Sequence, residues 1–352
     1  MKEKIKVLVI DDSPMFRKII SNNIETSDEI EVLGTARDSY EARDKIKKLK
    51  PQVLTLDIEM PGIDGIEFLK ILMSQLPIPT IVISTCNDRC FEAINAGAIA
   101  FVEKPKSNNM DSFSVELISK IKEASRAKVY KRRAPLQTTK TQTTTNSNLL
   151  SNSGIIKGNN DLIAIGASMG GVEAVSRVLR RLPTGLPPIV ITQHMPPVFT
   201  KKYSERLDKE CAIRVVEGKD GDILKSGYAY LAPGGKQMGV VNSSGVYKLV
   251  IKDTEKVSGH CPSVDYLFDS VAKEVKGEVI AVILTGMGSD GAKGLLNIRK
   301  KGGFTIGQNK ETCVVYGMPM VANKIGAVLK EAPLDSIPEI ILNKLKKKKV
   351  GI

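Results

Sequence analysis

The sequence has no tryptophan, only two histidines and no C-x-x-C pair among its five cysteines. Without paired cysteines or a histidine cluster, neither a disulfide framework nor a zinc site is indicated. Cys261 beside His260 leaves a Cys–His nucleophile open, but neighbours in a strand point to opposite faces, so we favour a small buried or incidental cysteine. No apolar run approaches the length of a membrane span, and residues 1–6 lead into a strand rather than a signal peptide, so we expect a cytoplasmic protein.

The net charge of +13 is concentrated in two segments that have almost no acidic residues. Seven basic residues lie between 125 and 160, and five more lie between 344 and 349. The segment 125–159 is also rich in Thr, Asn and Ser, so it cannot bury enough apolar surface to offset its ordering entropy. We predict a flexible basic linker at 125–159 and a basic tail at 346–352. We prefer these to a specific nucleic-acid surface, because no aromatic residues interleave the tail and no helix-turn-helix pattern is visible.

A length of 352 residues suggests about two domains. The first, residues 1–124, alternates amphipathic stretches with short apolar runs at 7–10, 53–56, 80–84 and 100–102. This alternation predicts an α/β domain in which helices cover both faces of a parallel sheet. Ligands of such doubly wound domains bind at the carboxyl ends of the strands.

Charged and polar residues stand at those strand ends, namely Asp11 and Asp12, then Asp57, Ser84 and Lys104. Three carboxylates in one crevice would repel one another unless a cation joined them, and hard oxygen ligands suit Mg²⁺. One carboxylate can then attack a phosphoryl donor while a lysine neutralises the transferred group. Taken singly, each acid could instead be a loop residue or a helix cap.

This domain resembles the receiver domain of bacterial response regulators, through VIDDSP at 9–14, LTLDIEMPG at 54–62 and AGAIAFVEKP at 96–105. The resemblance implies a flavodoxin-like fold with Asp57 as the phospho-acceptor. It also implies that Mg²⁺ is held by Asp11, Asp12 and Asp57. The residues that would contact the phosphoryl group or report it to the surface are Ser84, Phe101 and Lys104.

The second domain is organised around residues 161–171, DLIAIGASMGG. The apolar run 162–165 predicts a buried parallel strand, 166–171 a tight turn, and the apolar stripe in 172–182 a helix. Ser168 fits the G-x-S-x-G pattern, in which small residues let a serine hydroxyl leave the sheet at the start of a helix. Glycine-rich turns of this kind also hold phosphates, or only turn the chain.

Two further apolar runs end in groups that suit a serine hydrolase. One begins at 189 and ends at His194, and another, at 279–284, leads to Asp290. A histidine can take the proton of a serine hydroxyl when a carboxylate orients its ring, and a doubly wound sheet can bring three strand ends together. The order Ser, His, Asp differs from the Ser, Asp, His of ordinary α/β-hydrolases. Asp265 is the alternative acid, and we prefer Asp290 because it follows a strand.

Residues 160–345 resemble the catalytic domain of the chemotaxis protein-glutamate methylesterase family, through IGASMGG at 165–171, ITQHMPP at 191–197, LAPG at 231–234, PSVDYLF at 262–268, ILTGMGSDG at 283–291 and QNKETCVVYGMP at 308–319. The resemblance implies a Rossmann-like domain with Ser168 as nucleophile, His194 as base, Asp290 as orienting acid and the backbone N–H of Met287 as oxyanion donor. It implies hydrolysis of glutamate γ-methyl esters, and deamidation of glutamines, on methyl-accepting chemotaxis receptors. A chemotaxis histidine kinase would be the phosphodonor, and ester hydrolysis would need no cofactor.

The sequence departs from this family's pattern at two positions. Met169 stands where a threonine is usual, and Gln237 replaces a histidine. We expect both to affect rate or substrate preference rather than the triad. His260 matches a family histidine that either lines the cleft or has a structural role. Two other functions stay open, namely a response regulator whose second domain only binds a partner, and an esterase or amidase that acts on a different protein.

Overall fold

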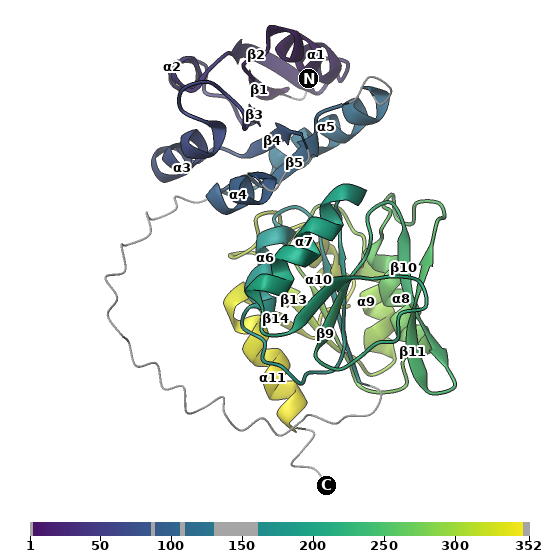
Figure 1. The fold of residues 1–352 in the computed structure, drawn as a ribbon. Helices are drawn as coiled ribbons and strands as arrows, with labels where there is room; N and C mark the ends of the chain where they lie inside the picture. The colour runs from purple at the N-terminus through teal and green to yellow at the C-terminus, as the bar shows by residue number, and fades with distance from the viewer. Residues whose placement is uncertain (1–2, 86–88, 106–109, 130–160, 348–352) are drawn as a thin grey trace. The chain divides into compact units, whose positions relative to one another are not determined.

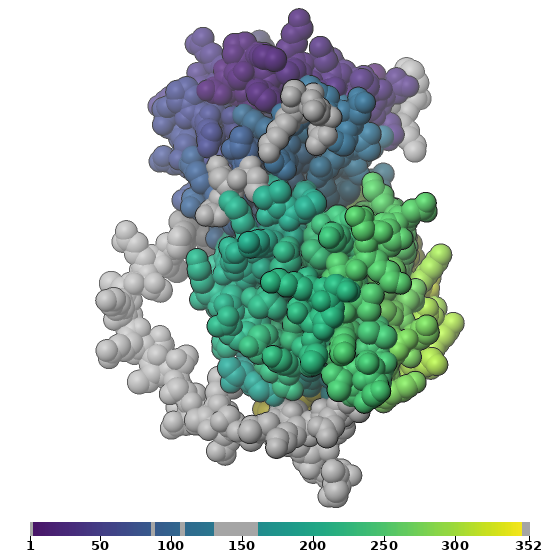
Figure 2. Space-filling model, turned by 45° about the vertical axis from the view of Figure 1, so that its right-hand side comes forward, coloured from purple at the N-terminus to yellow at the C-terminus, as the bar shows by residue number. Residues whose placement is uncertain are grey.

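The structure is a computed structural model that describes residues 3–85, 89–105, 110–129 and 161–347. The chain divides into two compact units, residues 1–141 and 142–352, and each is described by itself. Figure 1 shows the ribbon of each unit. Figure 2 shows their surfaces, with the first unit in purple to blue and the second in teal to yellow.

The predicted linker and tail lie largely outside the described residues. Of the linker at 125–159, only residues up to 129 are described, directly after helix α5 (Met110–Ala124). Of the tail at 346–352, the first two residues belong to helix α11 (Ile337–Lys347). This helix therefore extends past the predicted end of the second domain at 345.

The first unit contains a five-stranded parallel sheet with the strand order β2-β1-β3-β4-β5 (Figure 1). The strands are β1 (Ile5–Ile10), β2 (Ile30–Ala36), β3 (Val53–Asp57), β4 (Thr80–Ser84) and β5 (Ala100–Glu103). The helices between them are α1 (Pro14–Ile24), α2 (Ser39–Leu49), α3 (Gly65–Gln75) and α4 (Arg89–Ala96), and α5 follows β5. This strand order is that of the flavodoxin-like fold, so the predicted architecture is confirmed.

Local side-chain chemistry explains where several of these elements begin. Ser13, Asp38 and Asp64 each accept a hydrogen bond from a backbone N–H in the first turn of α1, α2 and α3, respectively. Such caps satisfy donors that have no partner inside the helix. β2 is absent from the apolar runs described above because only its first and last residues, Ile30 and Ala36, are buried.

The second unit contains a seven-stranded parallel sheet with the order β14-β13-β12-β6-β7-β9-β8 and a separate antiparallel hairpin, β10-β11. The strands are β6 (Leu162–Ala167), β7 (Ile189–Gln193), β8 (Arg214–Glu217), β9 (Tyr228–Leu231), β10 (Gln237–Ser243), β11 (Val246–Lys252), β12 (Val279–Ile283), β13 (Phe304–Gln308) and β14 (Lys330–Ala332). The helices are α6 (Gly171–Leu179), α7 (Pro197–Glu210), α8 (Val264–Glu274), α9 (Ala292–Lys300), α10 (Met318–Lys324) and α11, with a short 3₁₀ turn, η2 (Leu334–Ser336), before α11.

The strand order reverses at β6, which has β7 on one side and β12 on the other. Such a reversal opens a crevice at the carboxyl ends of the central strands, where ligands of doubly wound sheets bind. The predicted Rossmann-like sheet is therefore confirmed, and its central crevice lies where β6, β7 and β12 end.

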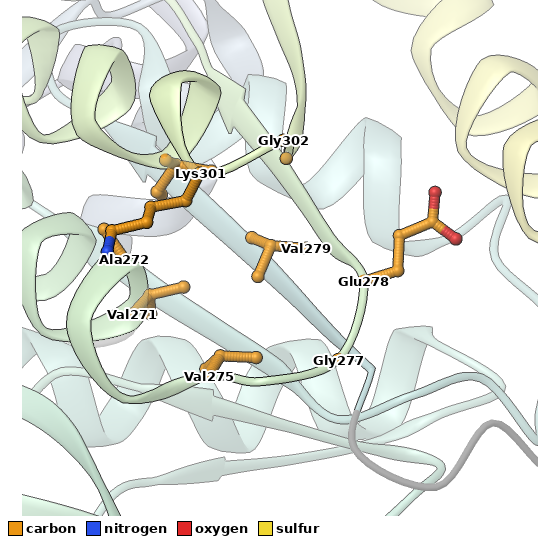
Figure 3. Close-up of a pocket in the computed structure, with 10 residues that line it drawn as sticks. Val271, Ala272, Val275, Gly277, Glu278, Val279, Lys301 and Gly302 are labelled. Carbon is orange, nitrogen blue, oxygen red and sulfur yellow. The ribbon is translucent and has the colours of Figure 1, made fainter.

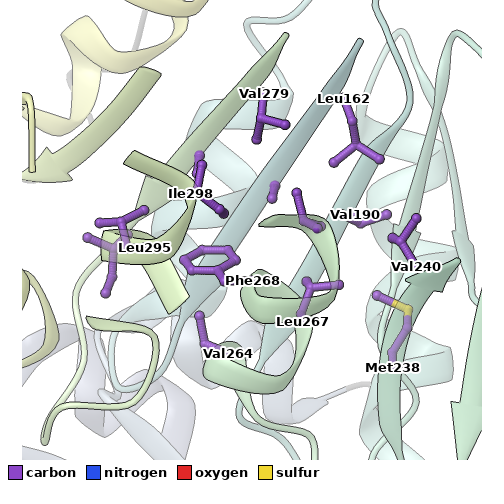
Figure 4. Close-up of a cluster of buried hydrophobic side chains, with 14 of the residues drawn as sticks. Leu162, Val190, Met238, Val240, Val264, Leu267, Phe268, Val279, Leu295 and Ile298 are labelled. Atoms are coloured by element: carbon purple, nitrogen blue, oxygen red, sulfur yellow. The ribbon is translucent and has the colours of Figure 1, made fainter. Parts of the chain in front are cut away.

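One face of this sheet packs under α8 and α9 (Figure 4). Alternate strand residues point into this layer, as Leu162 of β6 and Val279 of β12 do, because successive strand side chains face opposite sides. Phe268 of α8 and Leu295 of α9 cover them and are fully buried. Each such buried side chain stabilises the fold by about 1.5–3 kcal/mol. The packing fixes α8 against the central strands, close to the crevice.

The strand before Ser168 is longer than predicted, because Gly166 and Ala167 belong to β6 and not to the turn. A Cβ on Gly166 would come within 2.2 Å of a methyl group of Val264, so this glycine permits close packing against α8. Gly170 has a φ of +75°, a left-handed conformation that favours glycine, and it forms the turn itself. Within the described part of the chain, none of the helices combines the length and apolar composition needed to cross a membrane.

Candidate functional sites

Ser168 lies in the turn between β6 and α6, at the crevice, and is 5% exposed. Its N–H donates to the carbonyl of Thr285 at 3.0 Å. Its own carbonyl accepts from the N–H of Gly171 at 2.8 Å and from Nε2 of Gln193 at 2.8 Å. The backbone around the hydroxyl is therefore held from three sides, at the beginning of a helix whose dipole favours negative charge.

His194 directly follows β7, and its N–H donates to the carbonyl of Ala167 at 3.1 Å. This bond ties the ends of β6 and β7 together. The side chain is 6% exposed, with Nδ1 3.1 Å from Ser168 Oγ and Nε2 2.7 Å from Asp290 Oδ2. An ionised carboxylate only accepts, so Nε2 carries the proton and Nδ1 of the neutral ring is free to accept one from Ser168.

Asp290 lies in the loop after β12 and is 1% exposed. Besides His194, its carboxylate accepts from the hydroxyl of Ser263 at 2.8 Å and from the N–H groups of Val264 and Asp265 at 2.7 and 2.9 Å. These donors form the N-terminal turn of α8, where the helix dipole favours a negative charge. Burial by itself would raise the pKa of Asp290, but the hydrogen bond from His194, the positive charge of its ring when protonated and these backbone donors outweigh it, so the pKa is lowered.

Asp265, the alternative acid, makes different contacts although it is also buried. Its carboxylate accepts from the N–H of Gly294 at 2.8 Å and from the hydroxyl of Ser258 at 2.7 Å. Burial raises the pKa of Asp265, and the bonds from Gly294 and Ser258 only partly oppose this. Asp265 thus joins α8 to α9, and the acid whose carboxylate contacts His194 is Asp290.

The loop that carries Met287 lies against the nucleophile turn. A Cβ on Gly286 would come within 2.7 Å of Ser168 Cβ, so the glycine allows this loop to approach the serine closely. The carbonyl of Gly286 accepts from the N–H groups of Gly317 and Met318, at 3.0 and 2.8 Å. The backbone N–H of Met287 is therefore carried by a braced peptide next to Ser168.

Gln193 and Ser263 are two groups of the site that were not predicted from the sequence, whereas His260 was named there as a histidine that lines the cleft or has a structural role. Nε2 of Gln193 donates to the carbonyl of Ser168 at 2.8 Å and to the carbonyl of His194 at 3.1 Å, so this side chain bridges two residues of the site. His260 stacks on His194 with ring centroids 3.8 Å apart and planes 16° from parallel. Ser263, within the PSVDYLF segment at 262–268, is the N-cap of α8, but its bond to Asp290 depends on packing between distant segments.

Met169 and Cys261 are two side chains whose roles the sequence left open. Met169 is buried, so it presents little surface to a bound molecule. The thiol of Cys261 lies 3.8 Å from the carbonyl of Thr254, and burial raises its pKa. These contacts fit an incidental cysteine better than a nucleophile.

A small pocket of about 60 Å³ lies at the other end of β12, around Val279, Val271 and Gly277 (Figure 3). It is at the amino end of the strand, whereas Asp290 follows the carboxyl end. Ligand sites in doubly wound sheets lie at carboxyl ends. The pocket is therefore not connected with the serine site.

In the first unit, Asp11, Asp12 and Asp57 offer carboxylate oxygens that all lie within 4.8 Å of one another. The pairing of Ile10 with Leu56 brings this about, because the next residues, Asp11 and Asp57, leave adjacent strands together. Burial raises the pKa of Asp57, although its bond to Lys104 opposes this. A divalent cation would favour the ionised carboxylates, and oxygen ligands suit Mg²⁺. The residues therefore fit a cation site.

Lys104 follows β5, and its Nζ lies 2.6 Å from Asp57 Oδ2 and 3.1 Å from Asp11 Oδ2. Burial by itself would lower the pKa of Lys104, but the hydrogen bonds and charges of these two carboxylates raise it overall. Ser84, at the end of β4, is buried and its hydroxyl makes no hydrogen bond within the described residues. Phe101 is 7% exposed and its ring meets the ring of Phe91 edge-on, so the side chain of Phe101 points into the domain.

Comparisons with known proteins agree with this architecture. Residues 163–341 match the profile of the CheB methylesterase family, and residues 7–112 match that of the response regulator receiver domain. The chain is 46% identical over 341 residues to a protein of Syntrophomonas wolfei named protein-glutamate methylesterase/protein-glutamine glutaminase 2, covering 96% of this chain and 97% of that protein. It is 42% identical over 357 residues to the protein-glutamate methylesterase/protein-glutamine glutaminase of Syntrophotalea carbinolica, covering 99% and 100%.

The crystal structure of the Thermotoga maritima CheB methylesterase catalytic domain matches 52% of this chain and 97% of its own, with 39% identity and a TM-score of 0.51. The two curated relatives match over 96% or more of each chain, and each of the two profiles falls within one unit. The chain therefore belongs to the CheB methylesterase family, in a form that joins a response regulator receiver domain to the catalytic domain.

Proposed function

We propose that this protein hydrolyses glutamate γ-methyl esters, and deamidates specific glutamines, on methyl-accepting chemotaxis receptors in the cytoplasm, under control of phosphorylation at Asp57. The observation that carries the proposal is the chain of contacts from Ser168 Oγ through His194 to Asp290, at 3.1 and 2.7 Å. The names of the curated relatives support the substrate. Neither a specific nucleic acid nor membrane insertion is part of the proposal.

In acylation, Ser168 Oγ attacks the carbonyl carbon of the ester while its proton moves to Nδ1 of His194. The carbonyl oxygen becomes an oxyanion, for which the N–H of Met287 is the proposed donor beside the positive end of α6. His194 then gives its proton to the leaving methoxide, and methanol departs. A primary amide would release ammonia in the same way.

In deacylation, His194 takes a proton from water, which attacks the glutamyl ester of Ser168. The tetrahedral intermediate collapses, the serine oxygen recovers its proton from His194, and a glutamate carboxylate is released. Asp290 stays ionised throughout, because its four donors stabilise the negative charge. Its role is to hold the ring with Nδ1 toward the serine and to stabilise the imidazolium.

In the receiver domain, Asp57 is the proposed nucleophile toward a phosphohistidine of the chemotaxis kinase. An oxygen of its carboxylate bonds to phosphorus as the histidine nitrogen leaves, which gives an acyl phosphate. Lys104, 2.6 Å from Asp57, is placed to neutralise the charge of the phosphoryl group. Asp11, Asp12 and Asp57 would hold Mg²⁺, which when bound supplies further neutralising charge.

The test is methanol release from receptor membranes that carry labelled methyl esters. Wild-type protein should release methanol, faster after phosphorylation, and Ser168→Ala should release it at least about a thousandfold more slowly. Release by Ser168→Ala at the wild-type rate would refute the proposed nucleophile.

A further inference from the structure

Gln237, at the start of β10, is completely buried and uses both ends of its amide. Its Nε2 donates to the carbonyls of His260 and Glu255, at 2.9 and 3.3 Å. Its Oε1 accepts from the N–H of Ser263 at 2.8 Å. One side chain from the hairpin therefore clamps the backbone of residues 255–263 at three points.

The clamped segment carries two groups that touch the proposed triad. The His260 ring stacks on His194, with centroids 3.8 Å apart. The hydroxyl of Ser263 donates to Asp290 at 2.8 Å, and the turn that begins there supplies two more donors to the same carboxylate. Gln237 thus contacts His260, which contacts the ring of His194, and it contacts Ser263, which contacts Asp290.

We propose that Gln237 is a positioning residue for the reaction: by fixing His260 against one face of His194 and Ser263 against Asp290, it holds the imidazole where Nδ1 meets Ser168 and Nε2 meets Asp290. This inference rests on the triad roles proposed above. Gln237 does not contact the reacting atoms, and it acts through the segment 255–263. A displacement of about 1 Å in such a site can lower the rate about a hundredfold.

The chemistry of the clamp specifies which replacements preserve it. The position needs a donor toward the carbonyls of His260 and Glu255 and an acceptor toward the N–H of Ser263. A carboxylate keeps the acceptor but turns a second acceptor toward two carbonyls, so Gln237→Glu should open the clamp. A neutral imidazole has one donor and one acceptor nitrogen, so Gln237→His should keep one bond of each kind.

The experiment compares Gln237→Glu and Gln237→His in the full-length protein. Asn242→Asp is the matched control, since it makes the same amide-to-acid change on the same strand, while the amide of Asn242 contacts Gly245 and Glu274 and not the segment 255–263. Turnover is measured on receptor methyl esters and divided by the number of sites that a serine-reactive phosphonate labels. The downfield proton resonance of the His194–Asp290 hydrogen bond is recorded on the same samples.

For Gln237→Glu we expect kcat per labelled site to fall about 10–100-fold with little change in KM, and the downfield resonance to broaden or disappear. Gln237→His should recover most of both signals, and Asn242→Asp should match wild type. A normal kcat per labelled site in Gln237→Glu, with only fewer sites labelled, would show that Gln237 merely supports folding and would overturn the inference. Equal impairment of Gln237→His and Gln237→Glu would also overturn it.

Failure of the proposed triad is distinguishable from failure of this inference. If Ser168→Ala remained active in the same assay, the nucleophile would be wrong. The resonance of the His194–Asp290 bond does not depend on turnover, so its loss or persistence in Gln237→Glu would still decide whether Gln237 positions the pair.

Discussion

Replacing Asp290 with asparagine tests the site most directly, because the change preserves shape and removes one acceptor. The carboxylate accepts four hydrogen bonds, two on each oxygen. An asparagine must place its NH₂ group at one of the two positions. At Oδ2 it would face the N–H of Val264 as well as His194, and at Oδ1 it would face the N–H of Asp265 and the hydroxyl of Ser263. In either orientation, the NH₂ group faces buried donors that have lost their acceptor.

The magnitude follows from these contacts. A buried donor without a partner costs about 1–3 kcal/mol, so we expect Asp290→Asn to lower the free energy of unfolding by that amount. With NH₂ toward His194, the ring must carry its proton on Nδ1, where it can no longer accept from Ser168. With the carbonyl toward His194, the imidazolium loses its negative partner. We therefore expect kcat to fall by about a thousandfold or more.

The pH dependence of stability gives a second readout for Asp290. Burial tends to raise its pKa, but the bonds and charge around it lower the pKa below the ordinary value of 3.8. A carboxyl group whose pKa is lower in the folded state stabilises the fold above its unfolded pKa, and this contribution disappears as the pH falls through the folded value. Below about pH 4, Asp290→Asn should therefore lose less stability with falling pH than wild type does.

The assay is methyl-ester turnover per labelled site, together with denaturant unfolding at several pH values. Asp265→Asn is the control, because it alters a neighbouring buried carboxylate that bonds to Gly294 and Ser258 instead of His194. It should keep turnover within a few-fold of wild type. The reverse ranking of the two variants would refute the assignment of Asp290 as the orienting acid.

Three further predictions concern the triad, the receiver and their coupling. Ser168→Ala and His194→Ala should each reduce turnover about a thousandfold or more, and the double variant should lose little beyond that, because these residues act as a unit; additive losses would contradict this. Asp57→Asn should abolish the Mg²⁺-dependent, hydroxylamine-sensitive label acquired from the kinase or an acyl phosphate, and a persisting label would place the acceptor elsewhere. On the hypothesis that a tethered receiver inhibits the catalytic domain, a fragment starting near residue 159 should demethylate receptors faster than the unphosphorylated full chain, and phosphorylation should raise the full chain to or above the fragment's rate; equal rates before phosphorylation would exclude such inhibition.

Elements with strong local signals were predictable from the sequence. The central strands β3, β6, β7 and β12 are buried along their whole length, so each is made largely of apolar residues. The residues that follow such runs reach the carboxyl edge of a parallel sheet by geometry alone. This is why Asp57, Ser168 and His194 could be assigned to strand ends from the sequence.

Elements with mixed burial were not predictable in this way. β2 has buried residues only at its ends, and β14 has three residues, of which Lys330 and Glu331 are exposed. In the hairpin β10-β11, which lies outside the main sheet, burial is partial: the last three residues of β10 are not buried, and only two residues of β11 are. The hairpin, and with it the clamp formed by Gln237, was therefore not predictable from apolar runs.

The sequence by itself determined the two doubly wound domains and the strand ends at which reactive side chains gather, because strand burial and chain direction are written in short apolar runs. Only the tertiary structure decided which acid contacts His194. The sequence favoured Asp290 over Asp265 only because Asp290 follows a strand, whereas the packing of α8 turns its N-terminal donors toward Asp290 and directs Asp265 to Gly294 in the first turn of α9. The same packing stacks His260 on His194. These contacts join segments far apart in the chain, and they depend on how helices and strands fit together in three dimensions, which no local pattern of residues encodes.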